Sequence, residues 1–304
     1  MNKNKKRFNN ISKEYLNSKE YRVGEEITLL SFLLNTIKGQ SRNAIKGMLS
    51  HHLIAVNGSP TSQFDYTLYK GDTVLVSKAP LKKRNAVKLD IIYEDDDIIV
   101  INKPTKLLTV ASDKEKGRTA YREVSDYVQI KNPRNRVLVV HRIDEDTSGV
   151  LMFAKNLKTQ KLYQDKWNEL VVLRGYYAIC DGVFKEKKKT ITSYLKSNSL
   201  NLMYSSDDKV HGKKAITHYE VLKENENYSF LDVHIDSGRK NQIRVHLGDL
   251  GHHIIGDDKY GNPTNPINRL GLHAYCLKIH HPVTNKIMTF KAKTPKEFEK
   301  LFTK

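Results

Sequence analysis

From Leu89 onward, short apolar segments of strand length are separated by polar segments and by stretches with helical spacing. These strands and helices do not alternate strictly, and no glycine-rich phosphate loop follows a strand, so a dinucleotide-binding fold is disfavoured. The pattern predicts instead a mixed α+β domain over residues 89–304. The expected strands are Ile98–Ile101, Val137–Val140, Val150–Phe153, Val171–Ile179 and Phe230–Ile235, and the expected helices are Thr119–Ile130 and Leu157–Trp167.

Residues 14–76 have a different pattern, which predicts a separate and smaller domain. Ser41 is the expected N-cap of a helix on which Arg42 and Lys46 lie one turn apart, so that both can contact adjacent phosphates. A small β unit follows over residues 53–76, with a turn at Asn57-Gly58. An earlier helix is indicated by apolar residues at i, i+3, i+4 and i+7, namely Leu30, Leu33, Leu34 and Ile37.

Two helices followed by a small β unit resemble the RNA-binding domain first described in ribosomal protein S-four. The resemblance implies that residues 14–76 bind RNA, and a generic helical cap domain is the alternative. Residues 77–88, which follow, have the polar, proline-containing composition of a linker.

The chain carries a large positive charge that is concentrated in three segments. It has 52 Lys and Arg residues against 34 Asp and Glu residues, a formal net charge of +18. The excess lies in a basic tail at residues 1–13, in the linker 77–88 and in residues 285–304. Such clusters favour binding of a polyanion, because each neutralised phosphate releases a counterion. The alternative is that these lysines serve only solubility, in segments that stay solvated.

Hydrophobicity and cysteine content exclude several other classes of protein. The most apolar helical stretch, Ile27–Ile37, is too short to span a bilayer, and residues 1–13 lack the apolar core of a secretory signal. Cys180 and Cys276 are too few for a disulfide scaffold or a Cys-rich zinc module, and both are expected to be buried free thiols. We expect a cytoplasmic monomer with no membrane partner.

The densest polar segment of the chain is His141-Arg142-Ile143-Asp144-Glu145-Asp146-Thr147-Ser148-Gly149. Apolar segments flank it on both sides, and a loop anchored by buried strands can hold a reactive side chain in a fixed place. Three adjacent acids repel one another unless one of them enters a pocket and meets a cation. A surface turn with a local ion pair between Arg142 and Asp144 is the alternative that the residues leave open.

This segment resembles the active-site motif of the ribosomal large-subunit pseudouridine synthase family, His-Arg-Leu-Asp-x-x-Thr-Ser-Gly. The resemblance covers residues 89–302 and implies a mainly antiparallel sheet with flanking helices. The family also commonly carries a small RNA-binding domain at its N-terminus. Upstream, Asn102-Lys103-Pro104 is similar to another of the family's motifs. Four further similar segments follow downstream in the expected order, namely Arg174-Gly175-Tyr176-Tyr177-Ala178, a strand containing Gly238-Arg239 and Gln242-Ile243-Arg244, Gly256-Asp257, and Leu272-His273-Ala274.

The resemblance implies an isomerase that converts uridine in RNA to pseudouridine without a cofactor or a metal ion. Asp144 is the expected catalytic carboxylate. Burial opposes its ionisation, and Arg244 is the cation expected to compensate, since its planar fork can pair with a carboxylate bidentately. Tyr176 is expected to stack on the everted uridine, with Tyr177 on the opposite face of the strand. The substrate backbone is expected to contact Arg142 and Arg239.

Large-subunit ribosomal RNA is the expected substrate, with transfer RNA as the alternative. A non-catalytic RNA-binding or ribosome-assembly factor is the alternative function, and a metal-dependent nuclease is a second one. No metal site is expected, because in the pairs His51-His52, His252-His253 and His280-His281 adjacent side chains on a strand would point to opposite faces. His141 is expected to support the loop rather than to act as a base.

Three positions depart from the family's usual pattern. Lys106 stands where glycine is common, Asn241 stands where histidine is usual, and Glu145-Asp146 makes the loop unusually acidic. None of these departures removes a proposed catalytic group.

Overall fold

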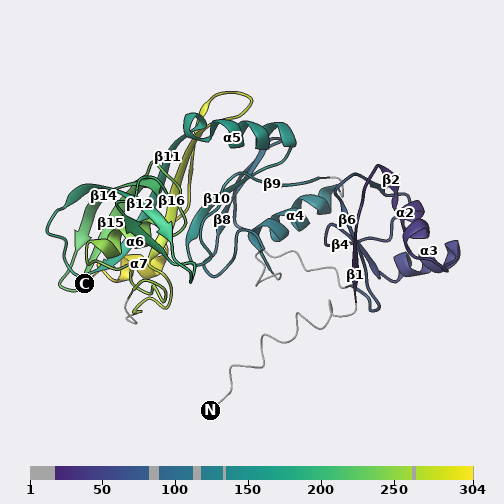
Figure 1. Cartoon of the computed structure of the whole chain (residues 1–304), viewed down its shortest axis with the longest axis horizontal. Coiled ribbons are helices and arrows are strands. Elements are labelled where there is room, and N and C mark those ends of the chain that lie inside the picture. Colours follow the sequence, from purple (N-terminus) through teal and green to yellow (C-terminus); the bar gives the residue numbers. More distant parts are fainter. Residues whose placement is uncertain (1–17, 82–88, 112–117, 133–134, 262–264, 304) are drawn as a thin grey trace, which may run out of the picture. The chain divides into compact units, whose positions relative to one another are not determined.

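The computed structural model of the chain describes residues 18–81, 89–111, 118–132, 135–261 and 265–303. The chain divides into two compact units, residues 1–87 and residues 88–304 (Figure 1). The basic tail 1–13 and residues 82–88 of the expected linker lie outside the described residues, so what the sequence predicts for them stays a prediction.

The first unit combines two helices with short antiparallel strands. A four-stranded sheet has the order β1-β6-β3-β4, and β2 pairs separately with β5. Ser41 caps α3 as predicted, because its side chain accepts a hydrogen bond from the amide of Ala44. Asn57 and Gly58 both have positive φ and form the tight turn between β3 and β4. The elements are β1 (Lys19–Arg22), β2 (Ile27–Thr28), α2 (Leu29–Thr36), α3 (Arg42–Ser50), β3 (Ile54–Val56), β4 (Ser59–Pro60), β5 (Thr67–Leu68) and β6 (Thr73–Val76).

The second unit is built on one long mixed sheet with the order β13-β12-β14-β15-β11-β16-β10-β8-β7, to which β17 and β9 add at β16 and β10. Its strands are β7 (Ile91–Glu94), β8 (Ile98–Lys103), β9 (Leu138–Val139), β10 (Ser148–Ala154), β11 (Val171–Asp181), β12 (Lys188–Ser197), β13 (Met203–Ser206), β14 (Lys213–Glu224), β15 (Tyr228–Ile235), β16 (Leu272–His280) and β17 (Ile287–Lys291). Its helices are α4 (Ala120–Lys131), α5 (Leu157–Leu170), α6 (Gln242–Asp249) and α7 (Lys296–Lys300). The predicted α+β class with a mainly antiparallel sheet is confirmed.

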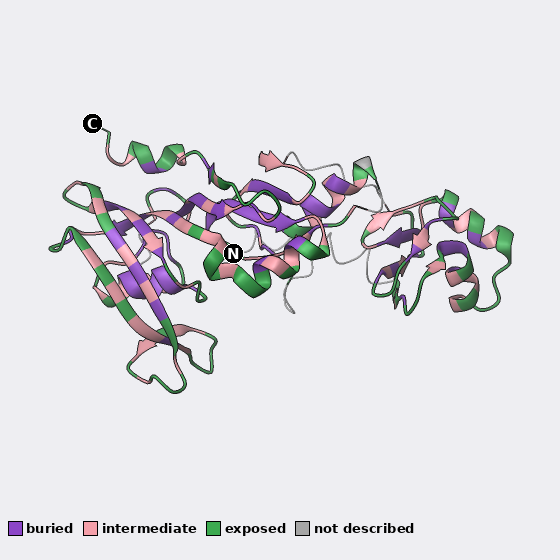
Figure 2. Ribbon diagram, turned by 90° about the horizontal axis from the view of Figure 1, so that it is seen from above, coloured by how far each residue is buried: buried purple, intermediate pink, exposed green. Residues whose placement is uncertain are grey.

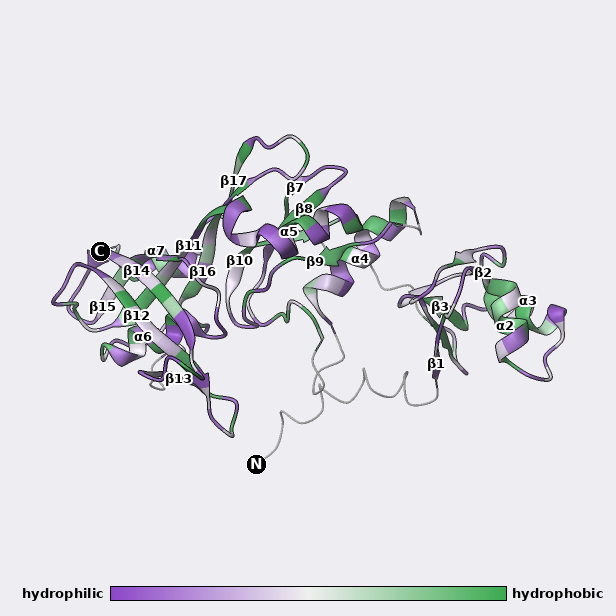
Figure 3. Cartoon of the chain, turned by 45° about the horizontal axis from the view of Figure 1, so that its top comes forward, coloured by the Kyte–Doolittle hydropathy of each residue, from purple (hydrophilic) through white to green (hydrophobic). Residues whose placement is uncertain are grey.

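Strands β8 and β10 are buried on both faces, which explains why their sequences are apolar without alternation. On one face, Ile99 and Phe153 pack in the same cluster as Val124 of α4. On the other face, Val100 packs in the same cluster as Tyr163 of α5. Figure 2 shows these strands buried between helices that carry exposed residues on their outer sides, and Figure 3 shows the hydrophobic residues of β8. The polar loop of residues 141–147 leads directly into this core.

The segment around Gln242 and Arg244 is a helix, α6, so the prediction of a strand there is wrong. Apolar residues at Ile243, Val245 and Leu247 alternate as they would on a strand. All residues from Gln242 to Leu247 are buried, however, so no polar face marks the helical period.

Gly149 allows the active loop to enter β10 beside another strand. It has φ +113°, and a Cβ atom at this position would lie 2.1 Å from the carbonyl oxygen of Ala274. The contact arises because β10 runs parallel to β16, with Gly149 opposite Ala274. Only a residue without a side chain fits this approach.

Candidate active site

The loop that carries Asp144 is held by hydrogen bonds from the segment after β8. The hydroxyl of Thr109 donates to the carbonyl oxygen of Ile143 (2.8 Å), and the hydroxyl of Thr105 donates to that of Asp146 (2.7 Å). The amide of Leu107 donates to the carbonyl oxygen of Glu145. These contacts fix the backbone on both sides of Asp144, whereas the sequence predicted only that the flanking strands anchor the loop.

Lys103 completes this support from a fully buried position. Its ammonium group donates to the carbonyl oxygens of Pro104 (2.9 Å), Leu107 (2.7 Å) and Glu145 (2.9 Å), so all three of its N–H donors are used. Burial lowers the pKa of Lys103 to about 7, although the carboxylates of Asp146, Asp144 and Glu145 oppose the shift. Sequence reasoning noted this lysine only as part of a motif. The signal that could have found it is a lysine at the end of an apolar strand.

Asp144 lies in the wall of two adjoining cavities, and among the described residues no group donates a hydrogen bond to its carboxylate. Burial raises the pKa of Asp144, whereas the positive charges of Arg244, Arg142 and Lys103 lower it. The local ion pair with Arg142 that the sequence left open is not formed. A carboxylate without donors in a cavity has its oxygen lone pairs available to a ligand.

The larger cavity, of about 850 Å³, brings together the predicted site residues of the second unit. This volume is typical of a small-molecule site. Polar and charged groups from the loop, from β11 and from the start of α6 line it. They include Arg142, Asp144, Tyr176, Arg239 and Arg244. A smaller cavity of about 290 Å³ shares Arg142, Asp144 and Arg244 with it.

Tyr176 and Tyr177 face opposite sides of β11, as predicted. Tyr176 lines the larger cavity, and burial raises its pKa to about 12, so that the phenol keeps its proton at neutral pH. Tyr177 stacks on Tyr275 with the ring centroids 3.9 Å apart and lines neither cavity. The Tyr176 side chain can therefore offer a flat apolar surface and a donor, but not a phenolate, to a ligand.

Arg244 is buried beside Asp144, but its guanidinium fork pairs with a different carboxylate. Nε and Nη2 of Arg244 lie 2.7 and 2.6 Å from the carboxylate oxygens of Asp257. Nη1 donates to the side-chain oxygen of Asn241 (3.2 Å), and the group lies 5.1 Å from the ring centroid of Tyr260. The expectation that the fork binds Asp144 is wrong. The charge of Arg244 still favours the ionised form of Asp144.

His141 supports the loop, as predicted. Its Nε2 accepts a hydrogen bond from the amide of Met152 (3.0 Å). Burial, together with the charge of Arg174, lowers the pKa of His141 to about 3, so the ring is neutral. Cys180 and Cys276 are buried free thiols, also as predicted.

Arg42 and Lys46 belong to the first unit and lie on the exposed side of α3. The ammonium group of Lys46 lies 4.6 Å from the ring centroid of Phe64. The spacing of one helical turn is present as predicted, and neither residue is among those that line the two cavities.

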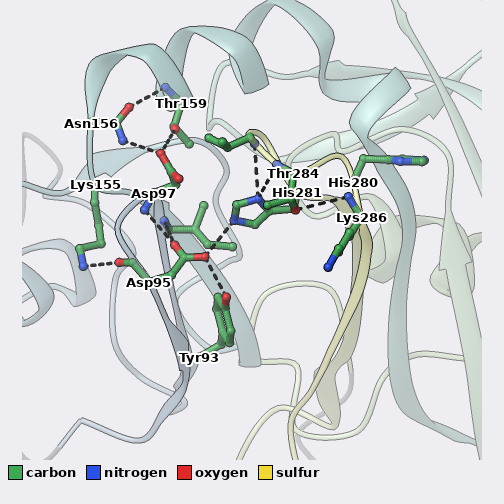
Figure 4. A network of polar contacts seen from close by, with 12 residues as sticks. Tyr93, Asp95, Asp97, Lys155, Asn156, Thr159, His280, His281, Thr284 and Lys286 are labelled. Atoms are coloured by element: carbon green, nitrogen blue, oxygen red, sulfur yellow. Dashed lines mark hydrogen bonds and ion pairs between the residues drawn. The ribbon is translucent and has the colours of Figure 1, made fainter.

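Sequence reasoning missed a polar cluster at the other end of β8. Ligand atoms of Asp95, Asp97 and His281 lie within 4.8 Å of one another, which is close enough for a metal ion (Figure 4). The oxygens of Asp95, however, accept hydrogen bonds from the amides of Asp97 and Ile98, from Tyr93 and from His281. This cluster joins β8 to the loop before β17 through hydrogen bonds between protein groups.

Across the part of the chain that the structure describes, no helix is long and apolar enough to cross a membrane.

Comparison with known proteins gives one consistent result. A family model described as RNA pseudouridylate synthase matches residues 97–249. The chain is 30% identical over 282 residues to the RNA pseudouridine synthase YhcT of Bacillus subtilis, covering 90% of this chain and 91% of the relative. It is 28% identical over 288 residues to ribosomal large subunit pseudouridine synthase D of Neisseria meningitidis, covering 89% and 76%. The fold is also similar to that of human RNA pseudouridylate synthase domain containing 1, with a TM-score of 0.56 and 24% identity over 71% of this chain and 87% of the other.

Proposed function

Because the chain belongs to the RNA pseudouridylate synthase family and is an isomerase that acts on uridine in RNA, we propose that Asp144, Tyr176 and Arg244 carry out its reaction in the larger cavity. The observation that carries the proposal is the state of Asp144. Its carboxylate has no hydrogen-bond donor among the described residues, lies in a cavity of nucleoside-binding size, and is surrounded by three positive charges.

The chemistry of the reaction explains why such a carboxylate is needed. The N1–C1′ bond of the uridine breaks, the base rotates, and C1′ bonds to C5, while the C5 proton is lost and N1 gains one. No atom is gained or lost and no net oxidation occurs, so no external group or electron donor is consumed, and the proposed reaction uses neither a cofactor nor a metal ion. Asp144 can attack C1′, add at C6 or remove the 2′ proton. Each of these routes uses the ionised carboxylate.

Arg244 acts by its charge, which opposes the effect of burial on Asp144. Asp257 and Asn241 hold the guanidinium in place, so it is already ordered before RNA binds. An ordered charge costs no reorganisation during the reaction. Arg244 therefore keeps Asp144 ionised without occupying its oxygens, which stay free for the substrate.

Tyr176 holds the base. A stacked uridine must be everted to reach Asp144, which costs a few kcal/mol, and stacking on an aromatic ring returns about 1–3 kcal/mol. The raised pKa keeps its hydroxyl protonated, so this group can donate a hydrogen bond near C5 of the base. Arg142 and Arg239 on the same cavity wall bind the RNA backbone.

The first unit acts as a ribosomal-protein S-four-like RNA-binding domain, with Arg42 and Lys46 on adjacent phosphates. Both side chains are exposed, and Ser41 fixes the start of their helix. The basic tail 1–13 and linker 77–88 add to the attraction for RNA.

The substrate is large-subunit ribosomal RNA, with transfer RNA as the alternative. Relatives named as ribosomal large subunit pseudouridine synthase D, which match most of this chain, support the first choice. We propose that the protein acts as a monomer, since all residues assigned to the reaction belong to one unit of one chain. The cytoplasm is the proposed compartment.

The test uses the full chain and two RNAs, a large-subunit ribosomal transcript and a transfer RNA transcript. Chemical mapping of pseudouridine should show conversion in the ribosomal transcript, and Asp144→Asn should abolish it. Asp146→Asn in the same loop is the matched control and should keep most of the activity. Equal conversion by Asp144→Asn, with circular dichroism showing a folded protein, would refute the role of Asp144. Conversion of the transfer RNA transcript alone would show that transfer RNA, not ribosomal RNA, is the substrate.

A further inference from the structure

Arg174 presents a positive charge in the larger cavity that is not paired with a carboxylate of any described residue. It precedes Tyr176 by two residues on β11, so both side chains lie on the same face of the strand, and both line the cavity. Among the described residues, its guanidinium makes neither a hydrogen bond nor an ion pair. Arg174 is half-buried. A partly desolvated cation without a bound anion is unfavourable, and burial accordingly lowers the pKa of Arg174.

The position of this guanidinium is nevertheless well defined. Its Cζ atom lies 6.0 Å from the ring centroid of Trp167, in the range of a cation–π contact. On another side it lies against Gly238, where a Cβ atom would be 2.8 Å from Nη1. Stacking and backbone contact hold the group in place, and neither provides a negative charge.

The nearest charges leave room for an anion. Arg239 is close enough to lower the pKa of Arg174 further, whereas Tyr176 and Asp236 act in the opposite direction. The Asp236 carboxylate already lies 2.9 Å from Nε2 of His218. Arg239 uses its Nε on the carbonyl oxygen of Lys214, and no hydrogen bond involves its Nη atoms among the described residues. Two arginines therefore line the same cavity, and each has guanidinium N–H donors that are not used by the described residues.

We propose that Arg174 and Arg239 form a subsite for an RNA phosphodiester next to the everted uridine, with Trp167 holding the Arg174 guanidinium. The inference rests on the proposed function, which places the uridine at Asp144 and Tyr176. Positions i and i+2 of a strand are about 7 Å apart, so a base at Tyr176 brings its own backbone to Arg174. The planar fork of arginine matches the oxygens of a phosphate.

The chain contains one tryptophan, Trp167, and it reports directly on this subsite. A short single-stranded oligouridylate added to the full-length protein should change the Trp167 fluorescence, and the titration should be repeated over a range of salt concentrations. Arg174→Gln should reduce the slope of log K against log salt by about 0.7, the effect of one lost phosphate contact on single strands. Arg174→Lys keeps the charge and should keep the slope.

Arg118→Gln is the matched control, because Arg118 is exposed, pairs with Glu123 and lines neither cavity. It should leave the slope unchanged. An unchanged slope in Arg174→Gln would overturn the subsite. An equal reduction of the slope in Arg174→Lys would also overturn it, because it would show that the packing of the side chain matters rather than its charge. A matching fluorescence change with inorganic phosphate alone, at equal phosphate and ionic strength, would overturn the assignment to RNA backbone.

The binding test is independent of catalysis, so the two proposals can fail separately. If the slope in Arg174→Gln equals that of the unsubstituted protein, and the unsubstituted protein converts uridine normally, only the subsite is rejected. Undiminished conversion by Asp144→Asn would reject the catalytic assignment, whatever the slope.

Discussion

Asp95 and Asp144 belong to the same unit but differ in their hydrogen bonds and in the direction of their pKa shifts. Asp95 accepts hydrogen bonds from two amides, a phenol and an imidazole, and these contacts lower its pKa despite burial (Figure 4). Asp144 accepts none from the described residues, and burial raises its pKa. The first carboxylate serves the fold, whereas the second keeps its oxygens free for a substrate at a cost in stability.

The largest effect on stability is expected where a carboxylate is both saturated and fully buried. Asp257 has this property, since it binds the Arg244 fork and also accepts from the amides of Lys259 and Tyr260. Asp257→Asn should lower the free energy of unfolding by about 3–5 kcal/mol, because a buried guanidinium loses its partner. Urea denaturation measures this free energy. As the control, Asp258→Asn at the exposed neighbouring position should change the free energy of unfolding by less than about 0.5 kcal/mol. A small effect at Asp257 would mean that solvent reaches Arg244.

The contrast between the two aspartates predicts opposite changes for the same substitution. Asp95→Asn replaces an acceptor by a group that cannot satisfy the same donors, and should cost about 1–3 kcal/mol of unfolding free energy. Asp144→Asn removes a charge that burial disfavours, and should leave the protein equally or more stable while conversion is lost. Urea denaturation of both variants at pH 7 is the measurement. Destabilisation by Asp144→Asn would show that its carboxylate has a structural partner.

The pH dependence of conversion should report the raised pKa of Asp144. Because only the ionised carboxylate reacts, kcat/KM should rise with pH through a midpoint above the ordinary aspartate value of about 3.9. Stability should fall over the same range, since the folded state holds this proton more tightly than the unfolded chain. Arg142→Gln removes a charge that lowers the pKa, so its midpoint should lie higher still. A midpoint at or below 3.9 would contradict the effect of burial.

The smallest effect concerns the segment that supports the Asp144 loop. Lys106 has φ +59°, a left-handed conformation that favours glycine, which is the residue the family commonly has here. Lys106→Gly should raise the free energy of unfolding by about 0.5–1 kcal/mol, and Lys106→Ala, which keeps the backbone strain, should not. Thermal denaturation of both variants distinguishes strain from loss of the side chain. Equal stability of the two variants would count against strain at this position.

Much of the fold follows from the apolar strands and the motifs between them. The loop at Asp144, the orientation of Tyr176 and the buried thiols could all be predicted, because each depends on strand periodicity or on a local motif. The helical state of α6 could not, since a helix buried on all sides shows no polar face. The partner of Arg244 could not either. Asp257 lies only 13 residues after Arg244, whereas Asp144 comes from a segment 100 residues earlier. The sequence does not show which of these two carboxylates the fold aligns with the guanidinium.

The tight passage of Gly149 past Ala274 has a practical consequence for anyone who wishes to change which uridine is modified. Saturation mutagenesis of the loop should recover one codon family at position 149 however lenient the selection, because every side chain would collide with the neighbouring strand. Mutagenesis should instead target positions such as Glu145 and Lys240, which line the cavities and whose exposed side chains can be replaced by larger or smaller ones.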